Sequence, residues 1–188
     1  MTRLLFPDNT VLINFAYISR MDLLQRLTGG NGAWCQSVAM ECAKSAQIEG
    51  LEDLRGADEI FGQPWRPETG AEHSEIRRLR EEMARPGDGA MKHLGEAETI
   101  VLMERRASDG RFVTDDAAAA RQAQAHGIAS NTTWDLRFLA LRLKWVDADT
   151  VYGYVGVLRQ RKRPVPHPLW SSRSSFDRWA TSADGTIP

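Results

Sequence analysis

The chain has 188 residues, a length typical of one domain. Its 24 basic and 25 acidic side chains give a formal charge of −1, which excludes a general polycation for nucleic acid, and a hydrophobic content of 42% excludes a disordered chain. No stretch approaches the roughly 18 apolar residues of a membrane span. The acid at Asp8 also interrupts any secretory signal core, so we expect a cytoplasmic protein.

Charge is distributed unevenly along the chain. Residues 151–188 carry six basic and two acidic side chains, a net charge of +4, so the first 150 residues carry −5. We therefore expect an acidic body followed by a basic tail. Because residues 164–188 follow the last expected helix, we expect little of the core to depend on them.

The first elements in chain order are a strand and three helices. The apolar residues 4–6 predict a buried strand, which Pro7 stops and Asp8 follows. The spacing of apolar residues and caps then predicts helices at three places: through residues 11–15, after a cap at Ser19, and over 34–47, the helix that carries Glu41.

Residues 50–90 are interrupted by nine Gly and Pro residues. Between them lies a charged helix, expected over residues 71–85, whose alternating signs predict a solvated face or a cover over part of the core. The segment is too short and too polar to bury a core of its own. We therefore interpret it as an insertion and not as a second domain.

Helices and strands alternate more clearly in the second half of the chain. A helix is expected over 95–107, then a strand over 111–114 that ends at Asp115 and Asp116. The elements expected after it are an alanine-rich helix to His126, a short strand over 128–130, and helices over 132–145 and 148–161. Strands that alternate with helices in this way imply an α/β fold, with a parallel sheet between two layers of helices.

These elements predict a single domain. Its expected parts are a core over about 3–145, the insertion over about 50–90, and a C-terminal helix with a basic tail over about 147–188.

Acidic residues follow two of the expected strands. Asp8 follows the first strand and Asp116 the second, and the carboxyl ends of parallel strands meet at one edge, where α/β proteins bind ligands. Glu96 starts the helix before the second strand, on the same side, and Glu41 joins if its helix packs over this edge. Clustered carboxylates repel one another unless a cation neutralises them, and oxygen ligands suit Mg²⁺ or Mn²⁺. The sequence therefore predicts an acidic, metal-binding crevice.

Three segments, in this order, resemble PIN domains: the opening Leu5-Phe6-Pro7-Asp8-Asn9-Thr10-Val11-Leu12-Ile13, the helix start Leu94-Gly95-Glu96-Ala97-Glu98-Thr99-Ile100, and Phe112-Val113-Thr114-Asp115-Asp116 with Gly127-Ile128 beyond it. The resemblance covers roughly residues 3–145. It implies a PIN-like three-layer α/β/α sandwich and a metal-dependent ribonuclease, as in the VapC-like toxins of bacterial toxin–antitoxin pairs.

The resemblance also assigns roles to individual residues. It places the catalytic acids at Asp8, Glu41, Glu96 and Asp116. Of these, Asp8, Glu96 and Asp116 are expected to bind the metal, with Asp115 as a further ligand. Thr114 is expected either to support the acids through a hydrogen bond or merely to fit a strand end.

Each of these residues also has a simpler interpretation. Asp8 and Asp116 are typical N-caps for the helices that follow them. Glu41 and Asp115 are equally typical of solvated surface positions. The basic run Arg159-Gln160-Arg161-Lys162-Arg163 is expected either to bind phosphates, through Arg159, Arg161, Lys162 and Arg163, or to be a solvated helix end.

The leading functional hypothesis is a Mg²⁺- or Mn²⁺-dependent endoribonuclease acting on single-stranded or structured RNA, with an antitoxin protein and a second copy of the chain as further expected partners. A phosphatase is disfavoured, because Thr10 stands where a second aspartate is required. The alternative outside catalysis is a nucleic-acid- or partner-binding module that keeps the fold and cleaves nothing. Binding of Mn²⁺ at the acids separates these hypotheses.

Overall fold

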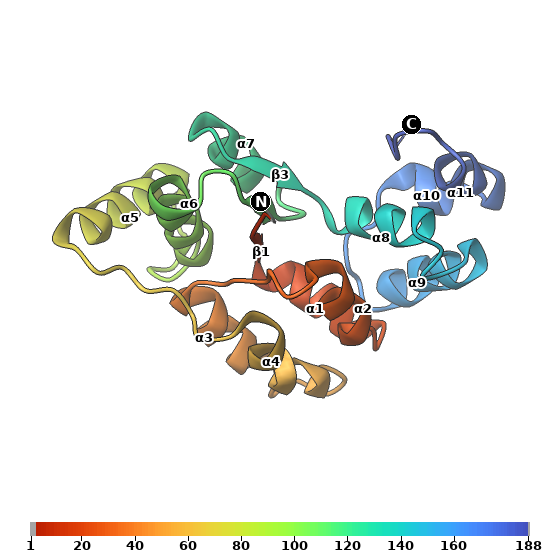
Figure 1. Cartoon of the computed structure of the whole chain (residues 1–188), viewed down its shortest axis with the longest axis horizontal. Coiled ribbons are helices and arrows are strands. Elements are labelled where there is room, and N and C mark those ends of the chain that lie inside the picture. Colours follow the sequence, from red (N-terminus) through yellow and green to blue (C-terminus); the bar gives the residue numbers. More distant parts are fainter. Residues whose placement is uncertain (1–2, 188) are drawn as a thin grey trace.

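A small parallel sheet lies at the centre of the computed structural model, which describes residues 3–187 (Figure 1). Its strands are β1 (Leu5–Pro7), β2 (Arg111–Val113) and β3 (Ala129–Asn131), paired in the order β1-β2-β3. Phe6 is paired with Phe112 in register. Each strand lies within one residue of its expected position, so the expected parallel sheet is confirmed.

The first helices follow directly from β1. They are α1 (Asn9–Tyr17), α2 (Met21–Thr28) and α3 (Gln36–Ser45). The expectation that Ser19 caps the second helix is wrong, because α2 begins after Arg20 and has no side-chain cap. Ser19 instead has a positive φ of 51°, in the tight turn between α1 and α2.

The chain enters α3 alongside β1. The Leu5 N–H donates to the Asn31 carbonyl at 2.9 Å, and the Ala33 N–H donates to the Leu5 carbonyl at 3.0 Å. This short pairing extends the sheet beyond β1 as an isolated parallel bridge between Leu5 and Gly32. It places the start of α3, and hence Glu41, beside the first strand.

The segment expected as an insertion contributes to the core. It contains η1 (Glu52–Gly56), α4 (Ala57–Phe61) and α5 (Gly70–Met83). Ile76 and Leu79 are buried on the charged helix α5, which packs against α6 (Leu94–Arg106), as Figure 1 shows. The charged helix is therefore a cover over the core, one of its two expected arrangements. Four other apolar side chains of the segment are also buried: Leu51, Leu54, Ala57 and Phe61.

Helices cover both faces of the sheet. Phe6 and Phe112 pack into a cluster with residues of α5, α6 and α7 (Ala117–Ala125). Val113 packs into a second cluster with residues of α1, α2 and α3 and of two later helices. Those later helices are α8 (Thr133–Arg142) and α9 (Ala148–Gln160). The expected α/β arrangement, a parallel sheet between helices, is thus found, although helix dominates the chain.

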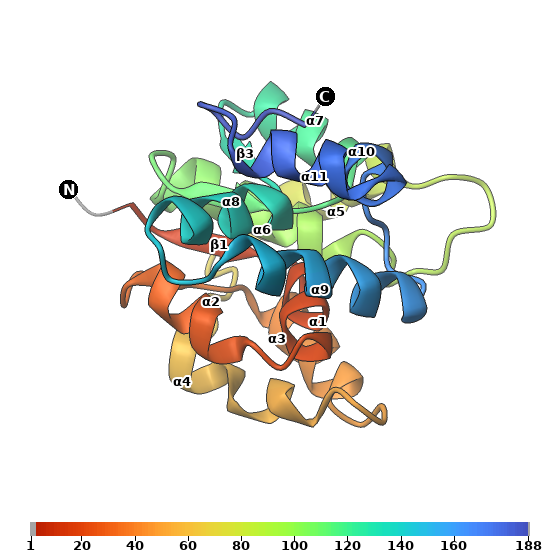
Figure 2. The same cartoon turned by 90° about the vertical axis from the view of Figure 1, so that its right-hand side faces the viewer.

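Two C-terminal helices complete the second cluster. They are α10 (His167–Ser171) and α11 (Arg173–Ala180), which Figure 2 shows beside α8 and α9. Leu169, Phe176 and Trp179 have exposed fractions of 0%, 0% and 1%. The expectation that little of the core depends on residues 164–188 is therefore wrong, and the core reaches beyond residue 145. The two helices are short and follow Pro- and Ser-rich segments, so their apolar periodicity is too brief to stand out in the sequence.

Within residues 3–187, no helix combines the length and the apolar character needed to cross a bilayer.

The buried C-terminal helices lead to a stability prediction. Phe176→Ala removes a fully buried ring, so we expect the free energy of unfolding to fall by about 3–5 kcal/mol. Urea denaturation followed by circular dichroism measures the change. The control is Arg178→Ala, an exposed position on the same helix, for which the change should stay within about 0.5 kcal/mol. Equal stability of the two variants would refute the packing described for α11.

Candidate active site

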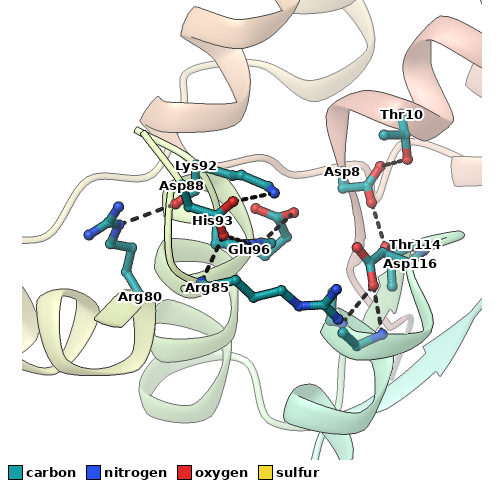
Figure 3. Close-up of polar contacts among 12 residues, drawn as sticks. Asp8, Thr10, Arg80, Arg85, Asp88, Lys92, His93, Glu96, Thr114 and Asp116 are labelled. Atoms are coloured by element: carbon teal, nitrogen blue, oxygen red, sulfur yellow. Dashed lines mark hydrogen bonds and ion pairs between the residues drawn. The ribbon is translucent and has the colours of Figure 1, made fainter. Parts of the chain in front are cut away.

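Asp8 lies at the carboxyl end of β1 and is only 5% exposed. One carboxylate oxygen, Oδ1, accepts hydrogen bonds from the Val11 N–H at 3.0 Å and from the Thr10 hydroxyl. The other, Oδ2, accepts a hydrogen bond from the Thr114 hydroxyl (Figure 3). Burial raises the pKa of Asp8 to about 6, although these hydrogen bonds oppose the shift. Asp8 is thus both the N-cap of α1 and a buried acid held to the end of β2.

Thr114 connects the two acids that follow the strands. Its hydroxyl donates to Asp8 and also accepts from the Asp116 N–H at 3.1 Å. Asp116 in turn caps α7, because its Oδ1 accepts from the Ala118 N–H at 2.6 Å and the Ala119 N–H at 3.2 Å. The hydrogen bond expected of Thr114 is confirmed, and so is capping by both aspartates. Within the described residues, Asp116 Oδ2 accepts no hydrogen bond and is free for a ligand.

Two glutamates from different helices lie near this pair. Glu96 lies in the first turn of α6, and Glu41 on α3 approaches that turn, with its Oε1 3.3 Å from the position that a Cβ would occupy at Gly95. Burial, and then the charges of Glu96 and Asp8, raise the pKa of Glu41 to about 7. The structure therefore brings Glu41 to the same edge as the other acids, with Gly95 allowing the close approach of its helix.

A histidine that belongs to no sequence motif, His93, lies beside Glu96. His93 precedes α6 with a positive φ of 65°, and its side chain is 12% exposed. Its Nε2 lies 3.3 Å from Asp88 Oδ2, and its Nδ1 lies 3.8 Å from Glu96 Oε1. Figure 3 shows Glu96 between this segment and the contacts that join Asp8, Thr114 and Asp116. Only the three-dimensional course of residues 84–93 reveals this placement, because no motif marks it.

The chemistry of the donors fits Mg²⁺ or Mn²⁺. All four acids offer carboxylate oxygens, which hard divalent cations prefer. The raised pKa values of Asp8 and Glu41 mean that nearby positive charge would stabilise their ionised forms. In the conformation of residues 3–187, however, no three His, Cys, Asp or Glu side chains already lie close enough together to hold an ion.

Asp115 is hydrogen-bonded to other partners, although its charge contributes to the raised pKa of Asp8. Its Oδ1 accepts from the Thr133 N–H at 2.8 Å, and its Oδ2 accepts from the Thr133 hydroxyl and from Asn14 Nδ2 at 2.8 Å. Its charge also favours the cationic form of Arg137, whose pKa burial lowers to about 10. Asp115 therefore holds the start of α8 and balances a buried cation, and its expected role as a metal ligand stays a prediction.

One member of the basic run is also engaged within the protein. Arg163 Nε donates to Asn14 Oδ1 at 2.7 Å, and its Nη2 donates to the Thr10 carbonyl at 3.4 Å. Arg163 accordingly attaches the end of α9 to α1, and its expected role in binding RNA stays a prediction.

The other basic side chains of the run are more accessible. The guanidinium of Arg159 stacks over Trp170 at 4.1 Å, and that of Arg161 lies 5.1 Å from the Tyr17 ring centroid. Lys162 is exposed. Figure 1 shows α9 on the opposite side of the sheet from α5 and α6. Binding of RNA by Arg159, Arg161 and Lys162 remains a prediction.

Comparison of the chain with models of protein families, with curated proteins and with solved structures found no significant match.

The raised pKa of Asp8 predicts how stability depends on pH. Folding raises this pKa from 3.8 to about 6, so the folded state binds the proton more tightly, and stability falls as the pH rises from about 4 to 6. At about 1.4 kcal/mol per pKa unit, the loss is about 3 kcal/mol. Asp8→Asn should remove this part of the pH dependence, and should be more stable relative to wild type at pH 8 than at pH 4. Urea denaturation in EDTA at both pH values measures the difference.

Asp147→Asn is the matched control for this experiment. Asp147 also caps a helix, α9, but it is exposed and hydrogen bonds lower its pKa. Its replacement should leave the fall in stability between pH 4 and pH 8 intact. If Asp8→Asn shows the same fall as wild type, Asp8 is not buried as a charged group.

Proposed function

We propose that this protein is a metal-dependent endoribonuclease with a PIN-like fold. The observation that carries the proposal is the convergence of Glu41 on α3, Glu96 on α6 and Asp8 at the end of β1, which lie close enough for their charges to raise the pKa of Glu41. Three acids from distant parts of the chain thus share one edge of a parallel sheet. Groups with perturbed pKa values at such an edge are typical of functional sites.

Asp8, Glu96 and Asp116 would hold Mg²⁺ or Mn²⁺ in this proposal. Such an ion, when bound, activates water and stabilises the charge that develops on a phosphodiester. The chain fixes Asp8 through Thr10 and Thr114, which leaves Glu96 and the free Oδ2 of Asp116 as the adjustable donors. One fixed carboxylate and two adjustable ones suit a site whose ligands move into place when the ion binds.

Glu41 has the properties of a proton acceptor. A general base works best when its pKa lies near the working pH, and the pKa of Glu41 is about 7. Burial is the largest cause of the shift, ahead of the charges of Glu96 and Asp8. We therefore assign to the Glu41 carboxylate the uptake of a proton from the attacking water.

The non-catalytic binding module remains the second candidate, because one observation favours it. Asp8 and Asp116 both cap helices, and the oxygens of Asp8 are already occupied by donors of the chain. In such a module the acids are structural. The toxin role that the resemblance implies adds an antitoxin partner to the first proposal and is separate from the chemistry.

The deciding experiment changes the charge of Asp116 without removing its cap. Asn caps helices as well as Asp does, so Asp116→Asn should keep the fold, and the metal-free variant should be as stable as wild type or more so. We expect cleavage of single-stranded RNA in Mn²⁺ to fall more than about 100-fold, because loss of an outer-shell partner alone costs about 10–100-fold.

Gel analysis of an end-labelled RNA measures the rate of cleavage. Asp147→Asn, which changes the cap of α9 in the same way, should cleave at the wild-type rate. Full activity of Asp116→Asn would exclude the assigned role. Absence of both cleavage and Mn²⁺ uptake by wild type, measured by calorimetry, would favour the binding module.

The basic run leads to a separate prediction about affinity. Arg161→Gln combined with Lys162→Gln should weaken RNA binding and reduce the dependence on salt, because each lost phosphate contact lowers the slope of log K against log salt by about 0.7 for single strands. Turnover at saturating RNA should stay unchanged, since these residues do not touch the acids. Affinities at several salt concentrations decide the point, and identical slopes would identify the run as a solvated helix end.

A further inference from the structure

A hollow of about 310 Å³ opens beside the acids. It lies between the connection from α5 to α6 and the start of α7, and Asp116 forms part of its wall. The basic side chains around it are Arg85, Lys92 and Arg121, with His93 next to them. The hollow therefore shares one residue with the candidate active site and has a different charge.

Two of these cations have no carboxylate partner among residues 3–187. Lys92 is paired with Asp88 at 2.6 Å, whereas no ion pair engages Arg85 or Arg121. Glu82, the other acid in the wall, is paired with Arg78. The unbalanced charge inside the hollow is accordingly positive, apart from Asp116 itself.

The position of Arg85 shows that the positive charge of the hollow lies next to the acids. Figure 3 shows its side chain reaching from the connection toward Asp116, across the hollow. Arg121 lies in the second turn of α7, a helix of nine residues whose positive end also faces this region. Two guanidinium groups from separate elements thus border one space that is next to the acids.

We propose that this hollow binds a phosphate of the RNA backbone through Arg85 and Arg121, next to the phosphodiester that is cleaved. The inference rests on the proposed ribonuclease function and names where its substrate is held. Guanidinium groups form bidentate hydrogen bonds with phosphate oxygens and stay charged at any physiological pH. They also compensate a repulsion, because four carboxylates by themselves would oppose the approach of a polyanion.

The hollow is distinct from the basic run at the end of α9. The run belongs to the C-terminal part of the chain, whereas Arg85 and Arg121 come from the α5–α6 connection and α7. In Figure 1, α5 and α6 lie on one side of the sheet and α9 lies on the other. The two basic surfaces would therefore hold different stretches of one RNA strand that passes the acids.

The test measures binding without cleavage. Fluorescence anisotropy in EDTA gives the Kd of a labelled single-stranded RNA for wild type and for Arg85→Gln combined with Arg121→Gln. We expect the double variant to bind at least about 10-fold more weakly at low salt, and its salt slope to fall by about 1.4, the value for two phosphate contacts on a single strand. Both residues are exposed, so the fold should persist, and thermal denaturation confirms it.

The matched control removes the same charge elsewhere. Arg77→Gln combined with Arg178→Gln neutralises two exposed arginines on α5 and α11 that do not border the hollow. Its Kd and salt slope should stay close to those of wild type. Equal losses in the two double variants would mean that only net charge matters, and would overturn the proposal.

The outcomes separate this inference from the proposed function. If wild type binds but does not cleave RNA, and the Arg85 and Arg121 variant loses that binding, the phosphate site in the hollow is supported and the nuclease activity is refuted. Active wild type with unchanged Kd in that variant would refute the hollow alone. A failure of wild type to bind RNA would overturn the inference. Binding of poly-glutamate, but not of RNA, through these arginines would also overturn it and would indicate an acidic protein partner.

Discussion

The hydrogen bond from Thr114 to Asp8 is the contact on which the arrangement of this site depends. It joins the residue after β1 to the residue after β2, more than a hundred positions apart in the sequence, within a sheet whose strands are only three residues long. The same hydroxyl accepts the Asp116 N–H, so one side chain sets the relative positions of both aspartates and of the helices they cap. The layers of helices hold this short sheet together, because its own ladder has few hydrogen bonds.

The sequence carried enough information for the sheet and for the acids at its edge. Runs of apolar residues that end in Asp predict strands whose carboxyl ends meet, and the three strands lie within one residue of their expected positions. The sequence did not show which way Asp115 turns, because neighbouring aspartates have identical chemistry and only the position of Thr133 and Asn14 distinguishes them. The sequence also does not predict α10 and α11, because these helices are short and their few apolar residues are recognisable as core residues only once the surface they cover is known. The hollow beside Asp116 depends on the course of an irregular connection, which no local pattern encodes.

The basic residues of the C-terminal tail mostly contact other parts of the protein. The basic tail is largely used to build the molecule: Arg163 binds α1, Arg159 stacks on Trp170, and the helices beyond them close the core. The unbalanced cations nearest the acids lie instead in the acidic body, around residue 85 and on α7. The net charge of a segment thus shows only where basic and acidic residues lie along the sequence. The contacts of each side chain in the fold decide which of these charges are available to a ligand.

The raised pKa values of Asp8 and Glu41 couple any cation at this edge to the proton concentration. Near pH 6 each carboxylate is protonated in a sizeable fraction of molecules, since their pKa values are about 6 and about 7. An ion that binds the ionised forms must displace those protons into the solvent. Its apparent affinity would therefore rise with pH up to about 7 and then level off, and calorimetry in buffers of different ionisation enthalpy would register the protons released.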